Sequence, residues 1–205
     1  MKRMNLENLP YWQENPAWLN EDTEGYRITD RDIYFGDDYK ELYHFRIEKS
    51  RFHDGFRGRH LVKVQFFNCD FSNMQFESAT LLKVEFNQCN LTGTEFSNMN
   101  MKSVMFNECK MMFNNFTECK FENIVFNDIM FKQLFLNQTK MKSLEFNRCQ
   151  IDDFEVFDTP LADVDLSGID LGKITIQEED LRGSIISSGQ AADFVKLFGL
   201  RVKRE

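Results

Sequence analysis

The sequence predicts an all-β solenoid of square cross-section, and two regular spacings carry this prediction. Every fifth residue from Phe56 to Ile186 is large and apolar, and similar segments recur every 20 residues. A period of five fits neither the 3.6-residue period of a helix nor the two-residue period of a simple strand. The chain must therefore turn a corner at each repeat, and four repeats close one coil.

The five-residue spacing continues without a slip over 27 positions. These apolar centres are Phe56, Leu61, Phe66, Phe71, Phe76, Leu81, Phe86, Leu91, Phe96, Met101, Phe106, Met111, Phe116, Phe121, Phe126, Phe131, Leu136, Met141, Phe146, Ile151, Val156, Leu161, Leu166, Leu171, Ile176, Leu181 and Ile186. A second inward position, two residues before each centre, mostly holds small or medium side chains such as Val64 and Cys69. The other positions are mostly polar, so each repeat forms one short side of a coil.

The 20-residue spacing predicts that like side chains stack from coil to coil. Similar four-residue segments begin at Phe66, Phe86, Phe106, Phe126 and Phe146. Each coil then contacts only its neighbours, and stability is a sum over the stacking interfaces. With neighbouring strands ~4.8 Å apart, just under seven coils form a rod of roughly 32 Å.

On these repeats the chain resembles the pentapeptide-repeat family from about residue 56 to 188, which implies a right-handed quadrilateral parallel β-helix. Within the family it is similar to the Qnr/MfpA-type quinolone-resistance proteins, especially the loop-free Gram-positive type. The similarity covers the stretch CNLTGTEF at 89–96, the Phe-rich centres, the total length and the segments GQAA at 189–192 and GLRV at 199–202. The unbroken spacing leaves no room for the projecting loops of the Gram-negative relatives.

Three segments are expected along the chain. Residues 1–55 form an N-terminal arm or cap with irregular first coils, because the five-residue spacing appears there only in fragments. We expect an irregular arm up to about residue 27 and one or two imperfect coils over about 28–55. Residues 56–188 form the pentapeptide-repeat β-helix, and residues 189–205 form a C-terminal capping helix and tail.

The C-terminal helix is predicted over 190–198, with Ser188 as its N-cap and Gly199 at its stop position. An open stack of coils needs such a cap, since its last coil exposes unpaired backbone groups. The apolar side chains of this helix exceed what one small face needs. They either only cover the last coil or also form a dimer contact, through Phe194, Val195, Leu197 and Phe198.

Composition narrows the location and the class of partner. A net charge of −8 argues against broad affinity for nucleic acid or acidic lipid. No apolar run approaches the ~20 residues that span a bilayer, and the first residues lack the apolar region of a secretory signal. Five cysteines without closely paired spacing favour a reducing compartment. We therefore expect a soluble cytoplasmic protein.

The titratable residues do not predict an enzyme, a cofactor or a metal site. His44, His53 and His60 are the only histidines, and even with Asp54 they are too few for a metal site. The five cysteines all occupy the second inward position, where a thiol acts as small apolar filling. No glycine-rich phosphate loop is present, and no nucleophile is paired with a base at a plausible spacing.

The acidic residues gather near the C-terminal end of the predicted rod. Residues 56–148 carry 11 Lys and Arg against 9 Asp and Glu, whereas residues 149–186 carry a net charge of −8. We name the ten acids of this second stretch the acidic collar: Asp152, Asp153, Glu155, Asp158, Asp163, Asp165, Asp170, Glu178, Glu179 and Asp180. The bland interpretation is that they keep an apolar rod soluble.

The family resemblance implies a sharper function for the collar. Such proteins mimic a DNA duplex, dimerise through their C-terminal ends and bind DNA gyrase or topoisomerase IV. A B-DNA segment of ~32 Å carries about 19 negative charges, whereas residues 56–186 carry a net −6. The mimicry therefore requires two collars to meet in a tail-to-tail dimer, with twice the collar's charge of −8.

An alternative function is a rigid scaffold that binds another protein partner, with the collar serving solubility alone. Six apolar residues at outward positions of the middle coils favour a binding surface of some kind. They are Met105, Met112, Phe113, Val125, Met130 and Phe135.

Overall fold

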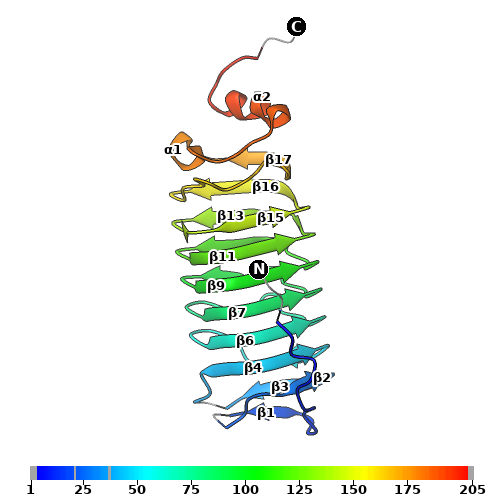
Figure 1. Cartoon of the computed structure of the whole chain (residues 1–205). Helices are drawn as coiled ribbons and strands as arrows, with labels where there is room; N and C mark the ends of the chain where they lie inside the picture. The colour runs from blue at the N-terminus through cyan, green and yellow to red at the C-terminus, as the bar shows by residue number, and fades with distance from the viewer. Residues whose placement is uncertain (1–3, 21, 37, 203–205) are drawn as a thin grey trace.

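The chain forms a parallel β-solenoid of about 8 turns in the computed structural model, which describes residues 4–20, 22–36 and 38–202. Strands of successive coils lie one above another along the rod (Figure 1). The strands are β1 (Ala17–Leu19), β2 (Arg27–Thr29), β3 (Asp32–Phe35), β4 (Glu41–Glu48), β5 (Arg51–Phe52), β6 (His60–Phe67), β7 (Thr80–Asn87), β8 (Glu95–Ser97), β9 (Asn100–Asn107), β10 (Asn114–Thr117), β11 (Lys120–Asn127), β12 (Met130–Phe131), β13 (Leu134–Asn137), β14 (Lys140–Met141), β15 (Leu144–Asn147), β16 (Gln150–Phe157) and β17 (Asp170–Thr175). The two helices are α1 (Glu178–Leu181) and α2 (Ser188–Leu197).

All strand pairs between coils are parallel, and they form three sheets that run along the rod. One has the order β1-β3-β5, the second β12-β16-β13-β10-β8 with β17 beside β16, and the third β14-β11-β9-β7-β6-β4-β2 with β15 beside β11. Leu61 pairs with Leu81, and Leu81 pairs with Met101. The 20-residue coil and the predicted fold class are therefore confirmed.

The core is a set of stacked apolar side chains inside the coils. Each of the 27 predicted centres is buried or half-buried. Phe66, Phe86, Phe106 and Phe126 stack with ring centroids 5.1, 5.1 and 5.0 Å apart.

The side of the coil next to this Phe column carries a ladder of amides. Asn107 Nδ2 donates to Asn87 Oδ1 at 2.9 Å, Asn127 to Asn107 at 2.7 Å, and Asn147 to Asn127 at 2.9 Å.

Most corners are made by a residue in the left-handed region, two positions after an apolar centre. Positive φ angles recur at five-residue intervals, for example at Lys63, Asn68, Asn73 and Ser78. Short polar residues tolerate this conformation better than bulky apolar ones. Phe113 is the exception, with a φ of 59° at an exposed corner.

The solenoid begins earlier than the sequence indicated. Strand β1 already pairs with β3, so the coils start at Ala17, and the prediction of an irregular arm up to residue 27 is wrong in part. The first coils are shorter: Ala17 pairs with Ile33, and Ile28 pairs with Ile47. These intervals of 16 and 19 residues are the reason that the five-residue spacing appears only in fragments there.

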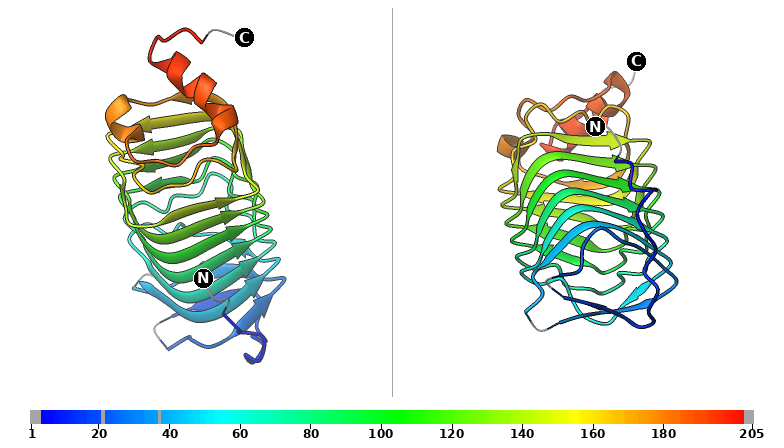
Figure 2. Two further views of the ribbon diagram at one scale, coloured as in Figure 1. Left: turned by 45° about the horizontal axis from the view of Figure 1, so that its top comes forward. Right: turned by 60° about the horizontal axis from the view of Figure 1, so that its bottom comes forward.

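The C-terminal cap differs from the prediction in two details. The short helix α1 lies within the stretch expected to continue the β-helix, and α2 begins at Ser188 with Ser187 as its N-cap. Ser187 forms a capping box with Gln190, three residues on, which favours it over Ser188. Gln190 Nε2 also donates to Leu166 O at 2.9 Å and to Ile169 O at 3.0 Å, which fixes α2 on the end of the rod (Figure 2).

We predict that Gly172→Ala destabilises the C-terminal end of the rod. A Cβ at Gly172 would overlap the carbonyl oxygen of Asp152 and lie 3.1 Å from its Cα, so β17 would have to move away from β16. We expect a loss of ~1–3 kcal/mol, as for other overpacked sites, measured by thermal unfolding. Gly168→Ala is the matched control, because a Cβ there meets nothing within 4 Å. Equal melting temperatures for the two variants would contradict this account.

Candidate protein-binding surfaces

The acidic collar occupies the last two coils before the cap. Three of its acids lie on β16, three on the turns between β16 and β17, one on β17 and three on α1. Some of these charges are neutralised within the chain. Lys132 Nζ lies 3.0 Å from Asp152 Oδ2, and Lys173 Nζ lies 3.3 Å from Asp153 Oδ2. Arg182 lies 2.9 Å from Glu178.

Asp180 was predicted as a surface residue of the collar, but it is only 4% exposed. Its Oδ1 accepts the N–H of Thr159 at 2.8 Å, and Thr159 Oγ1 in turn accepts the N–H of Thr139 at 3.0 Å. Burial is the largest cause that raises the pKa of Asp180. The carboxyl group therefore ends a buried hydrogen-bond column, and Asp180 is unavailable to a partner.

Six collar acids are exposed, and one of them, Glu178, is paired with Arg182. The other five are Asp158, Asp163, Asp165, Asp170 and Glu179. Within the described part of the chain none of them forms an ion pair. Glu155 is half-buried and accepts a hydrogen bond from Gln133 Nε2 at 2.7 Å. The surface that a partner would meet is thus smaller than the sequence indicated, and it lies mostly after β16.

The four predicted dimer residues divide between the core and the surface. Phe194 is 3% exposed and packs into the core of the rod, so it covers the last coil. Leu197 and Phe198 are 43% and 40% exposed, and Val195 is half-buried. The sequence reasoning missed three further apolar residues exposed near this end, Ile185, Leu200 and Val202. The helical period could not have separated these residues, because Leu197 and Phe198 follow Phe194 by three and four positions and so fall on the same face.

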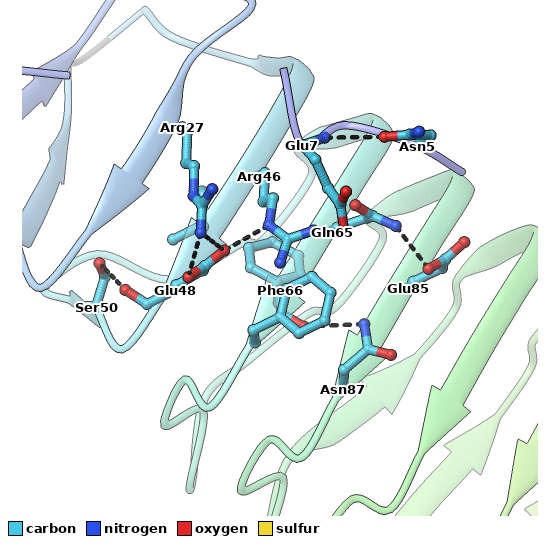
Figure 3. A network of polar contacts seen from close by, with 12 residues as sticks. Asn5, Glu7, Arg27, Arg46, Glu48, Ser50, Gln65, Phe66, Glu85 and Asn87 are labelled. Atoms are coloured by element: carbon cyan, nitrogen blue, oxygen red, sulfur yellow. Dashed lines mark hydrogen bonds and ion pairs between the residues drawn. The ribbon is translucent and has the colours of Figure 1, made fainter. Parts of the chain in front are cut away.

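The N-terminal segment, predicted from the sequence as an irregular arm or cap, lies along the outside of the coils. The N-terminal arm, residues 4–12, runs along the outer face of the coils (Figures 1 and 2). The backbone of Met4 donates to Glu85 Oε1 at 2.9 Å and accepts from Gln65 Nε2 at 3.0 Å. Figure 3 shows Gln65 and Glu85 beneath the arm, with Arg46 and Glu48 beside them.

The six outward apolar residues do not form one exposed surface. Met105 and Val125 are each 6% exposed, so their prediction as surface residues is wrong. Phe113 and Met130, at 57% and 63% exposed, are confirmed. Phe135 is half-buried and packs against Phe157, with ring centroids 5.8 Å apart.

The histidines and cysteines show ordinary structural roles. His53 Nε2 lies 2.7 Å from Asp32 Oδ1, and its ring stacks on Tyr34. All five cysteines are free and buried, as predicted. Burial raises the pKa of Cys119 to about 12, which disfavours the reactive thiolate. Over the described ranges no cluster of His, Cys, Asp and Glu has a metal-binding arrangement, and neither helix is long and apolar enough to cross a membrane.

Comparison with known proteins identifies the repeat and the fold. Residues 52–115 match the family described as Pentapeptide repeat region. A trypsin-treated variant of QnrB1, a plasmid-mediated fluoroquinolone resistance protein, is 16% identical with a TM-score of 0.52, and the match covers 93% of this chain and all of that one. No curated protein matches the chain.

Two further solved structures match with lower TM-scores. Full-length QnrB1 is 19% identical with a TM-score of 0.46, over 91% of this chain and 99% of that one. HetL, a pentapeptide-repeat protein involved in heterocyst differentiation regulation from the cyanobacterium Nostoc, is 13% identical with a TM-score of 0.42, over 87% and 93%.

We predict that Asp180→Asn stabilises the protein at neutral pH and has less effect in acid. The folded state raises the pKa of Asp180, so this residue's contribution to stability is fully present below its unfolded pKa. It is lost as the pH rises through the folded pKa. Asparagine retains an acceptor for Thr159 and has no charge to bury. Melting temperatures across the acid-to-neutral range, with the exposed Asp170→Asn as control, measure the effect. A variant that melts lower than the wild type at pH 7 would contradict it.

Proposed function

We propose that this chain, a pentapeptide-repeat protein by its repeats and its fold, binds a type II DNA topoisomerase as a mimic of duplex DNA. By the same proposal it acts in the cytoplasm without catalysis, and it modulates supercoiling or protects the enzyme from quinolones. The fold similarity to QnrB1 supports the proposal through the function stated for that protein. The distribution of charge along the rod supports it independently.

The observation that carries the proposal is the density of negative charge in the collar. Residues 149–186 have a net charge of −8, or −7 without the buried Asp180, and form close to two coils. Two coils span ~10 Å, a length over which B-DNA carries about six phosphate charges. The collar therefore reaches the charge density of a duplex, whereas residues 56–148, at a net +2, do not.

A tail-to-tail homodimer would place two collars on one continuous rod. Leu197, Phe198, Leu200 and Val202 are the exposed apolar residues that could form its contact. Burial of such side chains in a second copy removes apolar area from water, which favours association.

We predict that Asp158→Asn, Asp163→Asn and Asp170→Asn together weaken inhibition of DNA gyrase supercoiling about tenfold. The estimate takes ~0.5 kcal/mol for each exposed charge. Asparagine suits the left-handed corners at Asp158 and Asp163, so stability should not change. Supercoiling assays at low salt, with and without a quinolone, measure the effect.

The matched control removes three exposed acids outside the collar, by Glu95→Gln, Glu108→Gln and Glu118→Gln. Its inhibition should equal that of the wild type. Equal losses in both variants would show an effect of overall charge and contradict the proposal. Recovery of a partner that is not a topoisomerase, lost on Phe113→Asn, would instead favour the scaffold alternative, since Phe113 is the exposed aromatic residue held at a strained corner.

We predict that Leu197→Asp with Phe198→Asp converts a dimer to a monomer without unfolding the rod. Both side chains are exposed in the single chain, so their replacement removes only the contact with the second copy. Sedimentation at several concentrations measures the oligomeric state, and Phe113→Asp is the control for an exposed aromatic residue elsewhere. A wild-type protein that sediments as a monomer throughout would refute the dimer.

A further inference from the structure

A groove on the middle of the rod has properties unlike those of the collar. It crosses the first halves of β7, β9 and β11 and the short strand β14, and its volume is about 520 Å³. Leu82 and Met141, both half-buried, are the accessible apolar side chains of its lining, whereas Met101 and Phe121 are each only 2% exposed. The groove extends over four coils, which corresponds to ~14 Å along the rod, or roughly four residues of an extended peptide.

Four lysines surround this apolar floor: Lys102, Lys120, Lys140 and Lys142. Glu122 is the one acid in the lining, and it is already engaged by two of them. Its Oε1 lies 2.9 Å from Lys102 Nζ and 3.6 Å from Lys142 Nζ. The hydrogen bond from Lys102 is the largest cause of the lowered pKa of Glu122.

The other two lysines lie directly opposite each other. Lys120 and Lys140 are register partners on β11 and β14, and both are exposed. Neither has an ion-pair partner among residues 4–20, 22–36 and 38–202. Like charges on opposing strand positions are destabilising. The fold thus holds an uncompensated pair of cations beside an apolar groove, on a chain whose net charge is −8.

We infer that this groove binds an acidic segment of a partner protein, extended along the rod axis. Its carboxylates would neutralise Lys120 and Lys140, and its apolar side chains would rest on the half-buried Leu82 and Met141. A nucleic acid fits less well, because two unpaired cations are few for a phosphate backbone and Phe121, at 2% exposed, offers no ring face for base stacking. Because the groove is basic, its ligand is opposite in charge to a ligand of the collar.

The test uses the full chain and a fluorescein-labelled hexapeptide of sequence Glu-Phe-Glu-Leu-Glu-Phe. Fluorescence anisotropy should show binding that weakens with added salt. The double variant Lys120→Gln with Lys140→Gln should bind about tenfold more weakly, with a melting temperature no lower than that of the wild type. Lys40→Gln with Lys110→Gln, two exposed lysines outside the groove, is the matched control and should bind normally.

Methyl NMR locates the bound peptide. The signals of Leu82 and Met141 should shift on titration, whereas those of Met112 and Met130 should not. Absence of binding at millimolar peptide, equal binding by both double variants, or shifts at Met112 and Met130 would each overturn the proposal. So would preferential binding of an oligothymidylate or of phosphatidylglycerol vesicles that is lost in the Lys120 and Lys140 variant.

Discussion

The left-handed corner residue is the constraint on which the rest of the structure depends. A residue with an L side chain held there costs about 1–2 kcal/mol, and most repeats of the rod contain such a corner. Hydrogen bonds to the next coil offset this cost. Asn68 N–H donates to Asn87 O at 3.0 Å, Gln88 to Asn107 at 2.8 Å and Glu108 to Asn127 at 2.9 Å. Each corner therefore depends on the coil that follows it, so the last coils need the α2 cap.

This regular frame separates the candidate binding surfaces along one axis. The N-terminal arm covers part of the outer face near Gln65 and Glu85, the lysine groove lies on the middle coils, and the collar precedes the cap. Because each coil of a solenoid stacks on its neighbours in a fixed register, surfaces of opposite charge keep a fixed separation along the rod. A partner can therefore contact one without covering another.

The sequence predicted the direction of side chains much better than their environment. The spacing placed all the apolar centres inside the coils because direction follows from the local corner geometry. It could not show that Met105 and Val125 are buried, or that Asp180 is buried near the C-terminal end of the rod. Burial on the outer face depends on packing against other parts of the chain, and Asp180 lies where helix α1 replaces a regular side. The shortened first coils could not be predicted for the same reason, since strand pairing and not the five-residue spacing sets their register.

The amide ladder has a consequence for how the coils find their register. Apolar centres recur every five residues, so a coil displaced by one side of the square would still bury a full set of apolar residues. The residue after the centre is less uniform: it is Asn at 87, 107, 127 and 147, but Thr at 92 and Lys at 102. A coil displaced by one side would bring Asn107 against Thr92 or Leu82 of the preceding coil and break the continuous amide column. The apolar core thus drives collapse but does not specify the register between coils. The amide column favours the one register in which residues 20 apart lie opposite each other.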